Sequence, residues 1–107
     1  MKLLITLSIL AITILSADIE NGKDVYTQNC ANCHRTDMKG GMGKDFNLVS
    51  YSRRKEDIVK YVRSPSSMFR KFGYSANAMP QLPLNEQEIK DVSEFIDALQ
   101  PFKEWMK

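Results

Sequence analysis

Five consecutive residues, Cys30-Ala31-Asn32-Cys33-His34, decide how the rest of the chain is interpreted. Two cysteines one helical turn apart, followed at once by a histidine, form the attachment motif of a c-type haem. Each thiol can add to one of two neighbouring vinyl groups of the porphyrin, while the adjacent imidazole faces the iron. We therefore predict one covalently bound haem c, with thioethers to Cys30 and Cys33 and with His34 as an axial ligand of the iron.

Other sites that use cysteines at this spacing fit the chain less well. Two cysteines in a short exported protein often form a disulfide, and Cys-x-x-Cys is also a thiol redox motif. A thioredoxin-like site needs a βαβ context, which the sequence does not show. A zinc site needs four ligands, whereas the chain has two cysteines and a single histidine, all in one pentapeptide.

The second axial position of the iron cannot come from another histidine, because His34 is the only one. The position is either open or filled by another residue type such as methionine. Of the six methionines, Met38 and Met42 follow the attachment motif too closely, and the remaining exclusions are Met1, which leaves with the signal peptide, and Met106, which lies at the terminus. Met68 and Met79 remain. Met68 lies in a predicted turn of helix and is typical of core filling. Met79 lies in a loop and is followed by Pro80, so we predict Met79 as the second ligand.

Residues 1–17 have the layout of a secretory signal peptide: a basic residue, an apolar run from Leu3 to Leu15, then small residues. The run is shorter than the roughly 18–20 residues that cross a bilayer. We predict cleavage after Ala17, which leaves residues 18–107 as one monohaem domain in the periplasm. Leu15 is large for the third position before a cut, so an uncleaved membrane anchor facing the periplasm is the alternative.

Helical periodicity and capping residues predict an all-α domain of three to four short helices with long loops. The expected helices are 22–28 with Asn21 as the N-cap, Ser52 (N-cap) to Arg63, a turn at 66–71, and a helix that starts with the capping box of Asn85 and Glu88 and ends at Gln100-Pro101. Residues 36–50, with Leu48 and Val49 turned inward, and residues 73–84 are expected to be irregular. Such long loops need something to order them, and a flat apolar cofactor would do so.

The chain resembles class I cytochromes c of the small bacterial kind. The resemblance lies in Gly22-x-x-Val25-Tyr26 ahead of the Cys-x-x-Cys-His motif, and in Ala78-Met79-Pro80 followed by the pattern Glu86-x-x-Ile89-x-x-Val92-x-x-Phe95-Ile96. It covers essentially residues 18–100. It implies a cytochrome c fold around one haem, in which Gly22 lets the first and last helices cross closely.

The sequence departs from that family after the attachment motif. Many members have a Gly-Pro-x-Leu segment whose proline carbonyl accepts the ring N–H of the axial histidine, whereas this chain has Gly41-Met42-Gly43-Lys44-Asp45-Phe46-Asn47-Leu48. A backbone carbonyl of this loop can still orient His34, but the sequence leaves open which one. Tyr51, Arg53 and Arg54 either pair with the haem propionates or form an exposed basic helix start.

Charge and composition limit the possible partners. The chain has 15 basic and 13 acidic residues, too small an excess for nucleic-acid binding. The excess is concentrated: residues 35–71 hold ten basic and four acidic side chains. We therefore expect redox partner proteins with an acidic docking surface, engaged by Lys39, Lys44, Lys55, Arg70 and Lys71.

The expected function is electron transfer by a His/Met-ligated haem, in a monomer and without enzymatic activity. A haem subunit of a larger oxidoreductase complex fits the same residues. A five-coordinate haem enzyme or gas sensor is a third alternative, which requires that Met79 does not bind the iron.

Overall fold

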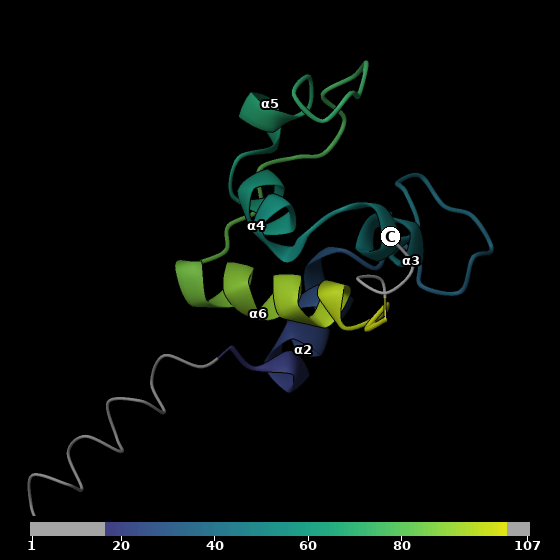
Figure 1. Ribbon diagram of the computed structural model, residues 1–107. Coiled ribbons are helices and arrows are strands. Elements are labelled where there is room, and N and C mark those ends of the chain that lie inside the picture. Colours follow the sequence, from purple (N-terminus) through teal and green to yellow (C-terminus); the bar gives the residue numbers. More distant parts are fainter. Residues whose placement is uncertain (1–16, 103–107) are drawn as a thin grey trace, which may run out of the picture.

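The computed structural model describes residues 17–102, which form five helices and no strand (Figure 1). The helices are α2 (Ile19–Asn29), α3 (Phe46–Ser52), α4 (Lys55–Arg63), α5 (Pro65–Met68) and α6 (Glu86–Asp97). The expected all-α class is confirmed. Most of the predicted signal peptide, residues 1–16, lies outside the described residues, as do the last five residues. Within 17–102, no helix is long and apolar enough to cross a membrane.

The first and last helices cross in close contact, and a glycine sits at the crossing (Figure 1). Gly22 of α2 is buried against α6. A Cβ atom at position 22 would lie 2.0 Å from the carbonyl oxygen of Asp91 and 2.9 Å from Cβ of Phe95. Only glycine allows the two backbones to approach this closely, which confirms the role that the family resemblance implied for Gly22.

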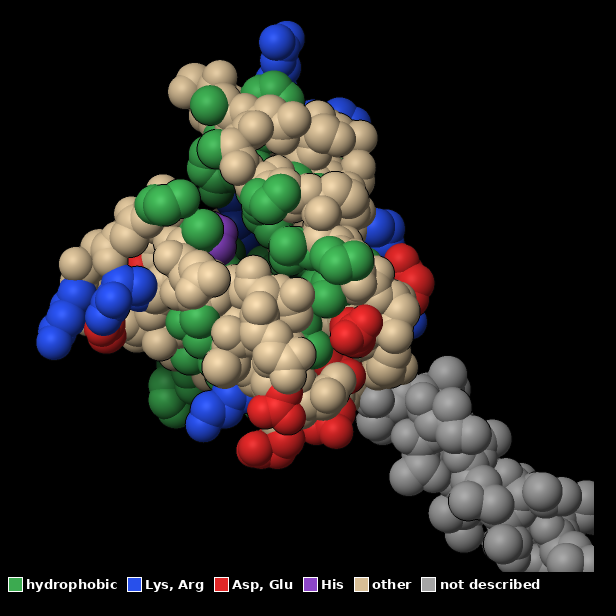
Figure 2. Space-filling model, turned by 180° about the vertical axis from the view of Figure 1, so that it is seen from behind, with side chains coloured by type: hydrophobic (Ala, Val, Ile, Leu, Met, Phe, Trp, Pro, Cys, Tyr) green, Lys and Arg blue, Asp and Glu red, His purple; other side chains and the backbone are tan. Residues whose placement is uncertain are grey.

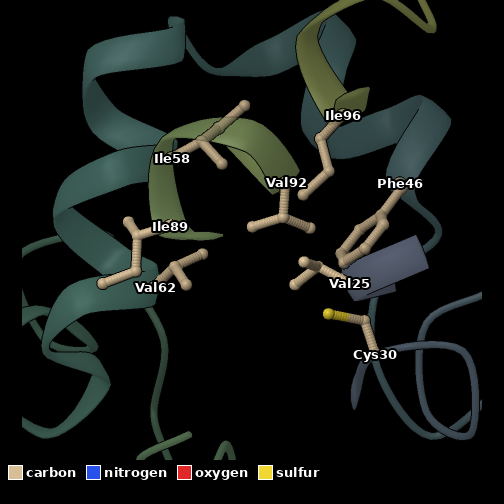
Figure 3. Packing of buried hydrophobic residues seen from close by; sticks show 8 residues of the cluster. All are labelled: Val25, Cys30, Phe46, Ile58, Val62, Ile89, Val92 and Ile96. Carbon is tan, nitrogen blue, oxygen red and sulfur yellow. The ribbon is translucent and has the colours of Figure 1, made fainter. Parts of the chain in front are cut away.

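The core is built on one face of α6. Ile89, Val92 and Ile96 recur at helical spacing and are at most 4% exposed. Figure 3 shows them gathered with residues of the other elements, which are Val25, Cys30, Phe46, Ile58 and Val62. Full burial of each aliphatic side chain contributes about 1.5–3 kcal/mol, so α6 is the element that α2, α3 and α4 pack against, while α5 packs on α4.

The start of α2 differs from the sequence expectation. We expected Asn21 to be the N-cap, but the helix begins three residues earlier, and Asp18 caps it by accepting a hydrogen bond from the Asn21 amide. The side chain of Asn21 instead donates to Asp91 Oδ2 at 2.8 Å. Both residue types cap helices well, and the contact with α6 decides which one does so here.

The middle of the chain corrects two further expectations. Residues 46–52, expected to be irregular or a helix cap, form α3, whose N-cap Asp45 accepts from the Asn47 amide at 2.8 Å. Ser52 is therefore the last residue of α3 rather than the cap of the next helix. Leu48 is 43% exposed rather than turned inward, while Val49 packs against the core as expected.

A bend at Arg53 separates α3 from α4. Arg53 has an extended backbone, and its guanidinium donates to the carbonyl oxygen of Phe72 at 2.6 Å and lies over the Phe72 ring. This contact fixes the bend from 19 residues away in sequence, which explains why helical periodicity alone missed it. The end of α4 at Arg63, before Ser64 and Pro65, is confirmed.

The C-terminal helix starts as expected and stops slightly earlier. Asn85 accepts from the Glu88 amide at 2.8 Å, and the Glu88 carboxylate accepts from the Asn85 amide at 2.9 Å, which completes the capping box. The helix ends at Asp97, and turns continue towards Pro101. The turn expected at 66–71 is α5 with the turns that follow it, and residues 74–85 contain neither helix nor strand.

The helix crossing makes Gly22 intolerant of any side chain. In Gly22→Ala, the added Cβ would strike the Asp91 carbonyl, so we expect the protein to lose about 1–3 kcal/mol of stability or more, although alanine favours helix. Denaturant unfolding of the haem-loaded protein measures the loss. Lys23→Ala, at an exposed position of the same helix, is the control and should change stability by less than about 0.5 kcal/mol. An unchanged midpoint in Gly22→Ala would contradict the crossing.

Candidate functional site

The end of α2 positions the Cys-x-x-Cys-His motif. Cys30 is the C-cap of the helix, and its amide donates to the Tyr26 carbonyl at 2.8 Å. The chain then makes one more tight turn, in which the amides of Cys33 and His34 donate to the Cys30 carbonyl at 3.1 and 2.9 Å. Both thiols are free. The three side chains that sequence analysis singled out are thus held together on a single turn.

The two thiols lie in different surroundings. Cys30 is 6% exposed and is part of the hydrophobic core, whereas Cys33 is half-buried. Figure 3 shows the Cys30 sulfur pointing to the space beside Val25. Burial, together with the charge of Cys33, raises the pKa of the Cys30 thiol to about 11. At neutral pH Cys30 is therefore a protonated thiol in an apolar environment, unlike the thiolate of a reactive redox cysteine.

The imidazole of His34 is fixed in one orientation by the loop that follows it. Its Nδ1 atom lies 2.8 Å from the carbonyl oxygen of Lys44. A carbonyl oxygen can only accept, so Nδ1 carries the proton and donates it. In the neutral ring, Nε2 then has a free lone pair, which is the state that a metal-ligating histidine needs. Lys44 thus supplies the acceptor that sequence analysis left open.

A glycine and an aromatic ring enclose the same imidazole. A Cβ atom at Gly43 would lie 2.4–2.8 Å from three atoms of the His34 ring. Phe46 stacks on His34 with ring centroids 4.5 Å apart and an interplanar angle of 16°. The backbone is held as well, since the Tyr26 hydroxyl donates to the His34 carbonyl at 2.9 Å. The ring therefore has little room to rotate.

Sequence analysis missed both of these residues. Gly43 was interpreted only as one of several loop glycines, and Phe46 was placed in an irregular segment. The available signal is the Gly41-Met42-Gly43 segment in the loop that follows the attachment motif, where a backbone that approaches the histidine needs glycine. Gly43 also donates its amide to the Cys33 carbonyl at 2.7 Å, which brings the loop back to the motif.

The face that carries His34 is hollowed. Figure 2 shows the histidine side chain at the floor of a recess bordered by hydrophobic side chains. Most of the basic side chains on this face lie at its outer edges, a basic side chain is also visible in the recess beside the histidine, and acidic side chains gather along the lower edge (Figure 2). An apolar recess with one well-oriented imidazole suits a large, flat, mostly apolar cofactor.

The two candidate methionines lie on the same stretch of chain. Met68 is the last residue of α5, and Met79 lies in the irregular segment between α5 and α6. Both are half-buried, so their burial does not distinguish them. Met79 lies between the exposed residues Ala78 and Pro80, outside any helix, and its position as the second ligand stays a prediction.

The three residues considered for the haem propionates have separate surroundings. Arg53 contacts Phe72, as described above, and Arg54 is the exposed N-cap of α4. Tyr51 is 44% exposed and lines a shallow hollow with Met38, Leu48 and Gln100. Their pairing with the haem propionates stays a prediction.

Comparison with known proteins agrees with this geometry. The family model described as cytochrome c matches residues 19–100, which includes all five helices. The chain belongs to the cytochrome c family. Curated relatives of this cytochrome include cytochrome c6 of Thermosynechococcus vestitus, 30% identical over 77% of the chain and 70% of the relative, and that of Diacronema lutheri, 30% identical over 74% and 93%. Cytochrome c6 of a Nostoc species is 29% identical over 77% and 71%. No solved structure matches.

The expected class I c-type cytochrome and its cofactor, one covalently bound haem c, are thereby confirmed. The residues present fit such a group. Two free thiols one turn apart directly precede the imidazole, whose Nδ1 is bonded to the Lys44 carbonyl, and the imidazole lies in an apolar recess. Within residues 17–102, no cluster of three or more His, Cys, Asp or Glu side chains offers a competing metal site.

The contact between Gly43 and His34 predicts how the cytochrome responds to a single methyl group. In Gly43→Ala, the added Cβ displaces the imidazole and breaks the bond from Nδ1 to Lys44. We expect a weaker iron–histidine bond, seen as a lower iron–histidine stretching frequency in resonance Raman spectra of the reduced protein in a Met79→Ala background, where the second axial position is open, and a reduction potential shifted by tens of millivolts. Met42→Ala, at a neighbouring side chain that is 88% exposed, should leave both unchanged. A wild-type spectrum from Gly43→Ala would show that the ring does not rest against position 43.

Proposed function

We propose that this cytochrome is an exported single-electron carrier whose haem is attached through Cys30 and Cys33, with His34 and Met79 as axial iron ligands. The observation that carries the proposal is the hydrogen bond from His34 Nδ1 to the Lys44 carbonyl. It fixes the tautomer in which Nε2 can bind iron. The bound haem supplies the chemistry, a one-electron change between ferrous and ferric iron.

The chain's own residues have three tasks in such a carrier. The Lys44 carbonyl, Gly43 and Phe46 hold the imidazole in one place, so the ligand need not move when the iron changes oxidation state. The apolar core around Cys30 excludes water from one side of the site. The helix crossing at Gly22 makes the frame rigid. A frame that stays the same in both oxidation states lowers the reorganisation that accompanies electron transfer.

Met79 is proposed as the second ligand because it lies in a segment without regular structure. A thioether in that position stabilises ferrous iron and raises the potential, and it closes the site to small molecules. A carrier needs such a closed site, whereas an enzyme or gas sensor needs an open one.

Replacing Met79 distinguishes an electron carrier with a closed site from an enzyme or gas sensor with an open one. In Met79→Ala, we expect the weak far-red absorption band of a Met-ligated ferric haem to vanish, the potential to fall, and the reduced protein to bind carbon monoxide at neutral pH. Met68→Ala, at another half-buried methionine, should keep the band and exclude carbon monoxide. If the wild-type protein lacks the band and binds carbon monoxide readily, the open-site enzyme or sensor replaces the carrier.

Export is part of the proposal. The apolar segment before Ala17 has the layout of a signal peptide, and haem c is attached outside the bacterial cytoplasm, so we place residues 18–107 in the periplasm. Ala17 is exposed and precedes α2, which leaves the junction accessible to a peptidase.

The partners are proposed to be redox proteins with an acidic docking surface. Lys39, Lys44 and Lys71 are exposed, and none of them forms an ion pair within residues 17–102. Lys55 is less suitable than expected, because its ammonium lies 3.0 Å from Glu94. The unpaired lysines can steer a partner over a distance limited by ionic screening, about 8 Å at physiological salt.

Charge steering predicts a salt-dependent rate. Electron transfer to the natural partner should slow as ionic strength rises, and the double variant Lys39→Gln with Lys44→Gln should be slower at low salt and less sensitive to salt. Lys55→Gln is the matched control, since that charge already has a partner. Stopped-flow kinetics measures all three. A wild-type rate that does not depend on salt would contradict steering, and stable co-purification with a larger enzyme would identify the cytochrome as a subunit of a complex.

A further inference from the structure

One buried carboxylate has no role in the haem site. Asp91 of α6 is 2% exposed and lies at the crossing with α2. A carboxylate without hydrogen-bond partners would be very costly there. Asp91 has three partners: the Asp18 amide at 2.8 Å, Asn21 Nδ2 at 2.8 Å and Gln87 Nε2 at 2.9 Å.

These donors keep Asp91 ionised. Burial raises its pKa, but the hydrogen bonds from Asp18, Asn21 and Gln87 outweigh burial and lower the pKa below its ordinary value. Asp91 is therefore an anion at neutral pH, and all three of its donors are neutral groups. Within residues 17–102, this buried negative charge thus forms no ion pair.

One of those donors lies at the predicted cleavage junction. The nitrogen of Asp18 is the atom that the peptide bond with Ala17 holds, and it is the atom that contacts Asp91. We propose that cleavage after Ala17 turns this nitrogen into an ammonium group that forms an ion pair with Asp91, so that processing itself locks α2 onto α6. This inference rests on the export proposed above.

The covalent step is a hydrolysis by a signal peptidase. The bond between the Ala17 carbonyl carbon and the Asp18 nitrogen breaks, water supplies the hydroxyl of the new Ala17 carboxyl group, and its hydrogen goes to Asp18. The amine then takes up a proton at neutral pH. No oxidant or reductant is involved, and the backbone nitrogen need not move, because it already lies 2.8 Å from Asp91 Oδ1.

The polar and charged groups around the Asp18 nitrogen determine whether an ammonium group is favourable there. The positive end of the α2 dipole disfavours an ammonium at the N-cap. Asp18's own carboxylate accepts from the Asn21 amide, Glu20 lies in the first turn of α2, and Gln87 on α6 is neutral. Asp91 is the group that contacts the nitrogen directly, and it is already buried and ionised, so the ion pair adds attraction without further burial of the carboxylate.

The pH dependence of stability follows from the pKa values of the new α-amino group and of the Asp91 carboxyl group. An α-amino group has a pKa of about 7.7–8.0 in an unfolded chain, and the anion beside it raises this value in the folded state. Its contribution to stability is then complete below about pH 7.7 and is lost as the pH rises through the folded pKa. The folded pKa of Asp91 is lowered, so its own contribution is lost only as the pH falls into the acidic range.

The test compares mature haem-loaded proteins that differ at the N-terminus. The full precursor is exported with a haem-attachment system, and intact mass should show a chain that begins at Asp18. A second precursor carries one glycine inserted between Ala17 and Asp18, so that after cleavage the Asp18 nitrogen is an amide again. At pH 6 we expect the wild type to melt at least about 4 °C higher than the insertion variant, with the difference shrinking towards zero at pH 9.5. In an Asp91→Asn background the difference at pH 6 should disappear.

A chain that begins at another residue, or equal melting temperatures at pH 6, would overturn the inference. Because Asp91→Asn may not fold, acylation of the α-amine under native conditions gives a second measurement. The ion-paired amine should react several-fold more slowly in the wild type than in the insertion variant, and equal rates would overturn the ion pair. The haem spectrum and carbon monoxide binding of the same samples report separately on the proposed carrier function, so either proposal can fail alone.

Discussion

The close approach of α2 and α6 at Gly22 is the constraint on which the remaining structure depends. The two helices come from opposite ends of the described chain, and their contact closes the fold. A backbone carbonyl of α6 lies where a side chain at residue 22 would be, so the two helices can approach this closely only with glycine at position 22. The core face of α6 then has a fixed direction, and α3 and α4 pack against it.

The functional motif takes its position from this crossing. The Cys-x-x-Cys-His turn is the direct continuation of α2, so whatever fixes α2 also fixes both thiols and the imidazole. The loop after it returns through Gly43 and Lys44, and the start of α3 delivers Phe46 to the other side of the same ring. Three local segments thus fix the orientation of the His34 imidazole, which would need no rearrangement to serve as the proposed iron ligand.

The parts of this protein that follow local chemical rules could be predicted from its sequence. The attachment motif and the capping box of Asn85 and Glu88 each lie within a few residues, so their partners are visible in one window. The bend at Arg53 could not be predicted, since Phe72 fixes it from elsewhere in the chain. The choice between Asp18 and Asn21 as helix cap depends on Asp91, which lies 73 and 70 residues away from them. Gly43 is a turn residue in sequence and becomes a contact of His34 only in three dimensions.

The bond between His34 and Lys44 uses the backbone of Lys44, and its side chain is exposed and makes no ion pair within residues 17–102. Almost every amino acid offers the same carbonyl group, so the identity of residue 44 matters little to the orientation of His34, the proposed iron ligand. Substitutions at this position can therefore change the charge that a partner meets while the chemistry of the metal stays constant. The side chain of residue 44 and its backbone carbonyl therefore serve different purposes, and substitutions can change the surface charge without changing the bond to His34.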